Sequence, residues 1–83
     1  MNTYQFDLIL SGLRQATDKD LENLGGELRS KGCLDPNPRM DKYGIRVSVK
    51  VDADTFTRAI YLSTQYITSI QGYRLSVRSV EFN

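Results

Sequence analysis

The chain has no histidine, no tryptophan and only one cysteine among its 83 residues. Without histidine, the commonest general base near neutral pH is missing, and so are triad-type hydrolysis and most zinc sites. The single thiol, Cys33, cannot form an internal disulfide and does not make a metal site. We therefore expect a protein that is not an enzyme, with no catalytic residues, no cofactor and no metal site.

Long apolar runs are also missing. No stretch approaches the ~20 apolar residues that are needed to cross a bilayer. The N-terminus lacks the basic region and the continuous apolar run that together mark a signal peptide. A lone cysteine is typical of a reducing compartment. The sequence predicts a soluble cytoplasmic protein without membrane contact.

The chain has little excess of either charge, with 11 basic and 10 acidic residues. This balance argues against a histone-like protein that coats polyanions. The charges are unevenly distributed, because residues 1–27 carry five acids against two bases, whereas residues 28–83 carry nine bases against five acids. One end of the molecule is therefore expected to attract anions, although the whole does not.

Three stretches alternate apolar and polar side chains, which is typical of strands with one buried face. They run from Thr3 to Leu10, from Ile45 to Val51 and from Tyr73 to Phe82. In the last stretch the alternation slips by one residue near Ser79, as a β-bulge would cause.

Two helices are expected between these strands. The first has Thr17 as its N-cap, Asp20 in a short capping box, and Gly32 at its C-terminal end. Its Gly25-Gly26 pair would allow close approach either of the sheet or of a partner backbone. The second helix is expected to begin after a cap at Asp52 or Asp54 and to end at Gly72. Its inward stripe consists of Phe56, Ala59, Ile60, Ser63, Ile67 and Ile70.

Residues 33–40 contain Pro36 and Pro38, so that only an edge strand could form there. With that strand, the chain is a single α+β domain over residues 1–83 with the ferredoxin-like order βαββαβ. Right-handed crossovers then place both helices on one face of an antiparallel-type sheet with strand order 4-1-3-2. Without that strand, a three-stranded βαβαβ sheet is the alternative.

A resemblance rests on the stretch Phe6–Gly12, on Gly32-Cys33-Leu34-Asp35 after one helix, and on a valine-rich strand that ends near Asp52. This pattern resembles a group of small bacterial proteins in which a comparable α+β unit often precedes a helix-turn-helix segment. Some of these proteins are described as antitoxin-like or regulatory. The resemblance implies the same α+β fold and a role of that kind, although the helix-turn-helix segment is absent here.

The first candidate binding surface is the sheet face opposite the helices, where alternation places four cations around Asp7: Arg46, Lys50, Arg74 and Arg78. This face could be a positive platform for an acidic protein patch or for phosphates. Alternatively, it is a solvated face whose charges are paired across strands. Sheet platforms that bind RNA place aromatic rings centrally. Here Asp7 and Ser48 occupy those positions, which weakens the case for nucleic-acid binding.

The second candidate surface lies on the second helix. Tyr61, Leu62 and Tyr66 fall outside its inward stripe. Such residues are typical interface anchors, and they would equally cover the edge of the core above the last strand. Self-association through a homodimer is left open.

These observations favour a non-enzymatic protein-binding module that acts by occluding a surface of its partner. A phage- or mobile-element-encoded inhibitor of a host defence complex, or an antitoxin, would fit. The alternative is a nucleic-acid-binding regulator that uses the basic sheet face.

Overall fold

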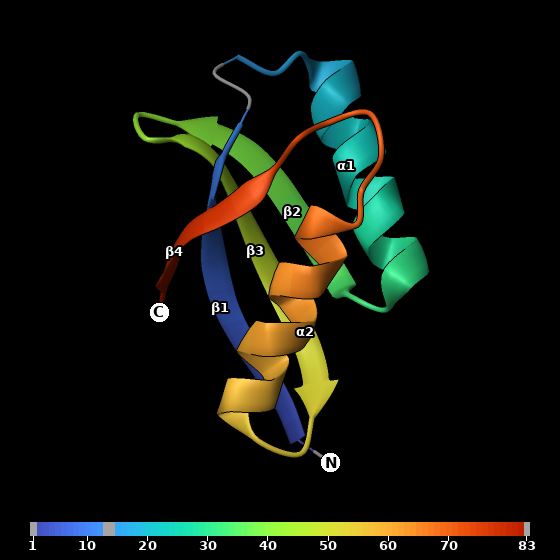
Figure 1. The fold of residues 1–83 in the computed structure, drawn as a ribbon, viewed down its shortest axis with the longest axis vertical. Helices are drawn as coiled ribbons and strands as arrows, with labels where there is room; N and C mark the ends of the chain where they lie inside the picture. Colours follow the sequence, from blue (N-terminus) through green and yellow to red (C-terminus); the bar gives the residue numbers. More distant parts are fainter. Residues whose placement is uncertain (1, 13–14, 83) are drawn as a thin grey trace.

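The computed structural model describes residues 2–12 and 15–82 of the chain. Two helices and four strands follow one another along it (Figure 1), namely β1 (Asn2–Ser11), α1 (Asp18–Lys31), β2 (Leu34–Asp41), β3 (Gly44–Ala53), α2 (Phe56–Thr68) and β4 (Ser76–Glu81). The edge strand that the sequence allowed at residues 33–40 is therefore present as β2.

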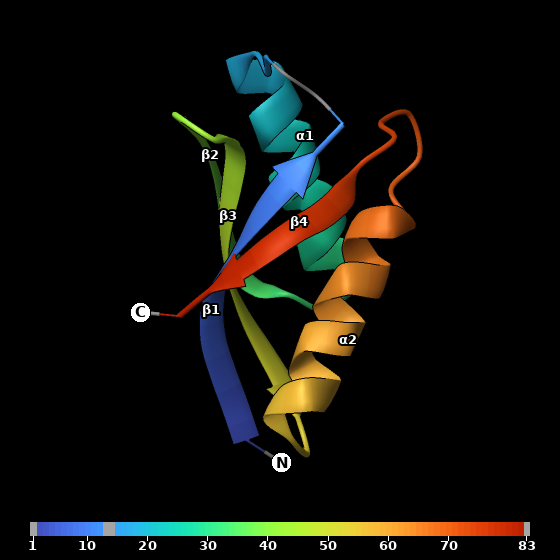
Figure 2. The same ribbon diagram turned by 60° about the vertical axis from the view of Figure 1, so that its left-hand side comes forward.

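The four strands form one sheet with the order β2-β3-β1-β4, which is the predicted order 4-1-3-2 read from the other edge. Each neighbouring pair is antiparallel. Both helices lie on the same side of the sheet (Figures 1 and 2). The other face carries no helix, and it is called the open face below.

The core lies between the sheet and the two helices. Alternate residues of β1 and β3 point into it, as the period of two predicts. The helices add Leu24, Leu28, Ala59 and Ile67. The buried strand residues are Phe6, Leu8, Leu10, Ile45, Val47, Val49 and Val51.

Helix α1 begins as predicted. The Thr17 hydroxyl accepts a hydrogen bond from the Asp20 backbone N–H, and the Asp20 carboxylate accepts one from the Thr17 backbone N–H. The two glycines inside the helix differ. A Cβ on Gly25 would lie 3.4 Å from the Pro38 ring, whereas a Cβ on Gly26 would meet nothing within 4 Å. Close approach to the sheet therefore accounts for Gly25 and not for Gly26.

Helix α2 corrects the predicted cap. Its N-cap is Thr55, whose hydroxyl accepts a hydrogen bond from the Arg58 backbone N–H at 3.1 Å. Asp52 still belongs to β3, which continues to Ala53, and its carboxylate accepts a hydrogen bond from the Thr3 hydroxyl. The helix also ends at Thr68, four residues before the predicted end at Gly72.

Strand β4 begins at Ser76, not at Tyr73 as predicted, and it ends at Glu81. The strand begins late because β1 ends at Ser11, opposite Ser76. Beyond this pair, Gly12 packs directly on the preceding segment, and a Cβ there would lie 2.1 Å from the Arg74 carbonyl oxygen. The predicted β-bulge is confirmed, because Ile9 pairs with Ser79 and Leu10 with Val77, which leaves Arg78 as the extra residue.

Candidate functional site on the open face of the sheet

Asp7 lies at the centre of the open face, on the inner strand β1. It is only 3% exposed. Its carboxylate accepts hydrogen bonds from Ser48 Oγ at 2.7 Å, from Arg46 Nη1 at 3.1 Å and from Arg39 Nη2 at 3.4 Å. Burial alone would raise the pKa of Asp7, but the hydrogen bonds from Ser48 and Arg46 and the two guanidinium charges lower it below its usual value. Asp7 is therefore an ionised group that is satisfied within the protein.

Arg46 joins three carboxylates. Besides Asp7, it donates from Nε to Asp41 Oδ2 at 2.7 Å and from Nη1 to Glu81 Oε2 at 2.7 Å. These partners raise its pKa, and its side chain is 15% exposed. Hydrogen bonds from Arg46 and from the Tyr43 backbone N–H lower the pKa of Asp41. The pairing of charges across strands, which was the alternative interpretation of this face, is therefore present at Arg46.

A different group of residues lies at the hairpin end of the open face. β2 and β3 are joined by Lys42 and Tyr43, and the Asp41 carboxylate accepts a hydrogen bond from the Tyr43 backbone N–H at 2.8 Å. The Tyr43 side chain is 50% exposed, and Lys42 Nζ lies 5.1 Å from the centre of its ring. Because a two-residue hairpin loop has no neighbours to bury its side chains, both project outward.

Arg78 completes this group, and Lys42, Tyr43 and Arg78 are called the hairpin patch below. All three line a shallow hollow of about 310 Å³ beside Ser11 and Gly12. Tyr43 and Arg78 also line a second hollow of about 190 Å³, together with Ile9, Ser79 and Glu81. Within residues 2–12 and 15–82, neither Lys42 nor Arg78 takes part in an ion pair.

The four cations that alternation placed on one face are separated in the structure. Lys50 lies on the same face of β3 as Arg46, four residues further along, but it lines a different hollow, next to Leu34 and Asp35 at the start of β2. Arg74 precedes β4 and is not part of the sheet, so the placement of Arg74 on the sheet face is wrong. Sequence reasoning missed Lys42 and Tyr43, although the turn signal Asp41-Lys42-Tyr43-Gly44 could have indicated that they are exposed.

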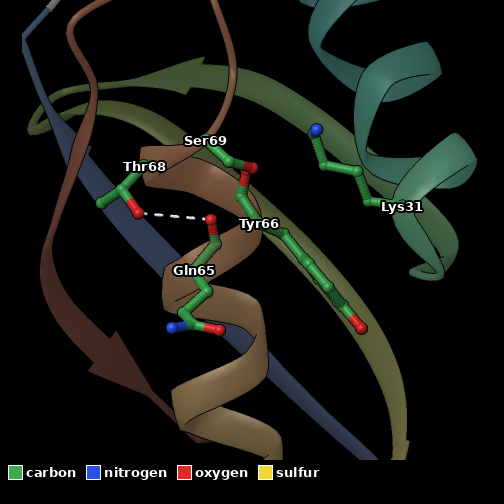
Figure 3. A pocket seen from close by; sticks show the side chains of 5 residues that line it. All are labelled: Lys31, Gln65, Tyr66, Thr68 and Ser69. Carbon is green, nitrogen blue, oxygen red and sulfur yellow. Dashed lines mark hydrogen bonds between the residues drawn. The ribbon is translucent and has the colours of Figure 1, made fainter.

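The residues on the second helix divide into two kinds. Tyr61 is exposed, and the centre of its ring lies 5.2 Å from Arg58 Cζ. Its hydroxyl oxygen accepts a hydrogen bond from Gln65 Nε2 at 2.8 Å. Leu62 and Tyr66 are partly buried and pack against the core. Figure 3 shows the Tyr66 ring extending from α2 beside Lys31 of α1, and a Cβ on Gly32 would lie 3.4 Å from its hydroxyl oxygen. Leu62 and Tyr66 therefore cover the edge of the core.

Figure 3 also shows the shallow hollow, about 500 Å³ in volume, that Tyr66 and Lys31 line with Gln65, Thr68 and Ser69. Thr68 Oγ1 donates to the Gln65 carbonyl oxygen at 3.2 Å. The Thr68 and Ser69 hydroxyls each donate to a carbonyl oxygen of their own helix. These polar groups are thus occupied in ending the helix.

The chemistry of the remaining groups is limited. Cys33 is buried, and burial raises the pKa of its thiol to about 11, so that it is protonated near neutral pH. The described part of the chain has no cluster of three or more potential metal ligands. None of the helices in the described residues is both long and apolar enough for a membrane span. Comparison with family models, with curated proteins and with solved structures finds no match to this chain.

Proposed function

We propose that this protein is a non-enzymatic binding module that holds an acidic surface of a partner protein at the hairpin patch. The observation that supports this most is the contrast between two kinds of cation on one face. Arg39 and Arg46 are hydrogen-bonded to carboxylates of the chain itself. Lys42 and Arg78 instead line a hollow beside the half-exposed ring of Tyr43.

The three side chains of the hairpin patch have complementary roles in such contact. Tyrosine supplies a large, stiff contact area at a low cost in conformational entropy, and it is common among the residues that dominate interfaces. The charges of Lys42 and Arg78 would attract carboxylates and set the rate of association and the discrimination between partners. Ile9, which is buried and lines the same hollow as Tyr43 and Arg78, would give the contact an apolar base.

The biological role that we propose is occlusion of a partner surface, as by an inhibitor of a host complex or by an antitoxin. The chain order β-α-β-β-α-β and the sheet order β2-β3-β1-β4 support a ferredoxin-like classification, which we also propose. A free thiol at Cys33 fits a cytoplasmic setting.

Affinity capture from the source cell, followed by mass spectrometry, would supply candidate partners. The test is titration of a purified candidate against the wild type and against Arg78→Glu. We expect saturation at a fixed ratio for the wild type and slower association for Arg78→Glu. Lys50→Glu is the matched control, because it makes the same charge reversal on the same face away from the hairpin patch, and it should bind as the wild type does.

Equal binding by Arg78→Glu and the wild type would refute the assignment to the hairpin patch. Turnover of a substrate by sub-stoichiometric protein would refute the non-enzymatic role. Binding of duplex DNA, with an affinity that falls by about 0.9 in log–log slope per phosphate neutralised, would instead support the nucleic-acid alternative.

A further inference from the structure

Half of the central strand β1 has a partner on one side only. β3 pairs with β1 from Asn2 to Leu10, whereas β4 pairs with it only from Asp7 to Ser11. Within the described residues, no strand pairs with the β4 side of residues 2–6. Figure 2 shows this end of β1 extending well beyond the end of β4. The backbone groups on that side are therefore open to another strand.

The opposite edge of the sheet is protected against such pairing. β2 contains Pro36 and Pro38, which have no backbone N–H to donate. Its pairing with β3 is also irregular between Leu34 and Asn37. Prolines and bulges are the devices that keep edge strands from pairing with other chains.

The open stretch of β1 has none of these devices. Its sequence Asn-Thr-Tyr-Gln-Phe contains no charge, no proline and no glycine, and Thr3, Tyr4 and Phe6 are residues that favour strands. Because it is uncharged, an antiparallel pair of two such stretches brings no like charges together. A second copy of the same stretch can therefore pair with it without charge repulsion.

An exposed apolar surface continues from this edge. Phe82 follows β4, is 62% exposed and packs edge-on against Phe56 with 4.9 Å between the ring centres. Tyr4 lies 5.2 Å from the same Phe56 ring. Phe82 would thus lie beside any strand added next to Tyr4, and the added strand would cover part of this aromatic surface.

We propose that the protein forms a dimer in which residues 3–5 of two copies pair as antiparallel strands about a two-fold axis at Tyr4, between the Phe82 residues of the two copies. The two sheets then become one continuous sheet. In this register Thr3 of one copy lies opposite Gln5 of the other on the open face. The dimer edge and the hairpin patch are at opposite ends of β1, so the two proposals are independent.

The test is sedimentation velocity over a wide range of protein concentrations. We expect a dimer for the wild type. The double variant Thr3→Lys with Gln5→Lys places lysines of the two copies opposite each other, and we expect its dissociation constant to rise about tenfold or more. The matched double variant Thr3→Lys with Gln5→Glu places a lysine opposite a glutamate, and we expect it to remain a dimer. Asn37→Lys on β2 is the control for the other edge.

A wild type that stays monomeric at the highest concentration would overturn the proposal. So would a folded Lys/Lys variant, as judged by circular dichroism, that dimerises as the wild type does. Amide hydrogen exchange of the wild type gives a second readout that needs no variant. Protection of residues 3–5 should increase with protein concentration, and protection that is independent of concentration would also overturn the proposal.

Discussion

Arg46 Nη1 lies 3.1 Å from Asp7 Oδ2, and the two residues are diagonal neighbours on β3 and β1, since Ser48 is the residue directly opposite Asp7. The same arginine reaches Asp41 at the end of β2 and Glu81 at the end of β4. A single side chain therefore links all four strands on the face that no helix covers.

Removal of Arg46 should destabilise the protein more than removal of a neighbouring cation. Arg46→Ala leaves the buried carboxylate of Asp7 with Ser48 and a longer contact to Arg39, and we expect a loss of about 3 kcal/mol in the free energy of unfolding. Lys50→Ala, four residues along the same strand, should change it by less than about 0.5 kcal/mol. Urea denaturation measures both, and equal losses would show that the carboxylate contacts of Arg46 do not contribute to stability.

Acid should unfold the protein partly through Asp7 and Asp41, whose pKa values in the folded state are both lower than the usual 3.8. As the pH falls, the unfolded chain therefore binds protons before the folded protein does. The stabilisation is complete above about pH 4–5 and is lost as the pH falls through the folded-state pKa values. Asp7→Asn should flatten the dependence of unfolding free energy on pH below pH 4. A slope in that range identical to that of the wild type would contradict the role of Asp7.

The two glycines of α1 should respond differently to alanine. Gly26→Ala should stabilise the protein by about 0.5–1 kcal/mol, because the added methyl meets nothing and alanine favours a helix interior. Gly25→Ala should gain less, because its methyl would touch Pro38 at 3.4 Å. Thermal denaturation of both variants measures the difference, and a larger gain at Gly25 would show that the helix does not lie close against β2.

The start of α2 gives a further comparison between adjacent residues. Thr55→Ala removes the hydroxyl that caps the Arg58 backbone N–H, and we expect a loss of about 1 kcal/mol. Asp54→Ala should cost less, because Asp54 does not bond to the helix within the described residues. A larger loss for Asp54→Ala in chemical denaturation would show that Asp54, one of the two caps predicted from the sequence, caps the helix instead.

Local signals were sufficient for much of this fold. The capping box of Thr17 and Asp20, the alternation of β3 and the slip near Ser79 each depend on a few consecutive residues, and each predicted its element. The start of β4 could not be predicted in this way, because it depends on where the distant Gly12 packs on Arg74.

The candidate site was harder to predict for the same reason. Arg46 and Arg78 look alike in an alternating pattern, but only the register of three strands shows that carboxylates surround one and not the other. The exposed ring of Tyr43 belongs to the turn Asp41-Lys42-Tyr43-Gly44, and a turn signal alone carries no indication of binding.

The pairing of β1 with β4 has a consequence for how the protein is made. β1 leaves the ribosome before the other elements described here, and its partner β4 follows all of them, so the pair of Asp7 and Glu81 cannot form until nearly the whole described chain has emerged. During translation, β1 can pair only with β3, and the Glu81 contact of Arg46 is still missing. Pairs so distant in sequence also form slowly. The nascent chain therefore exposes a strand edge longer than that of the finished protein, and such an unpaired edge is prone to aggregation until β4 has paired.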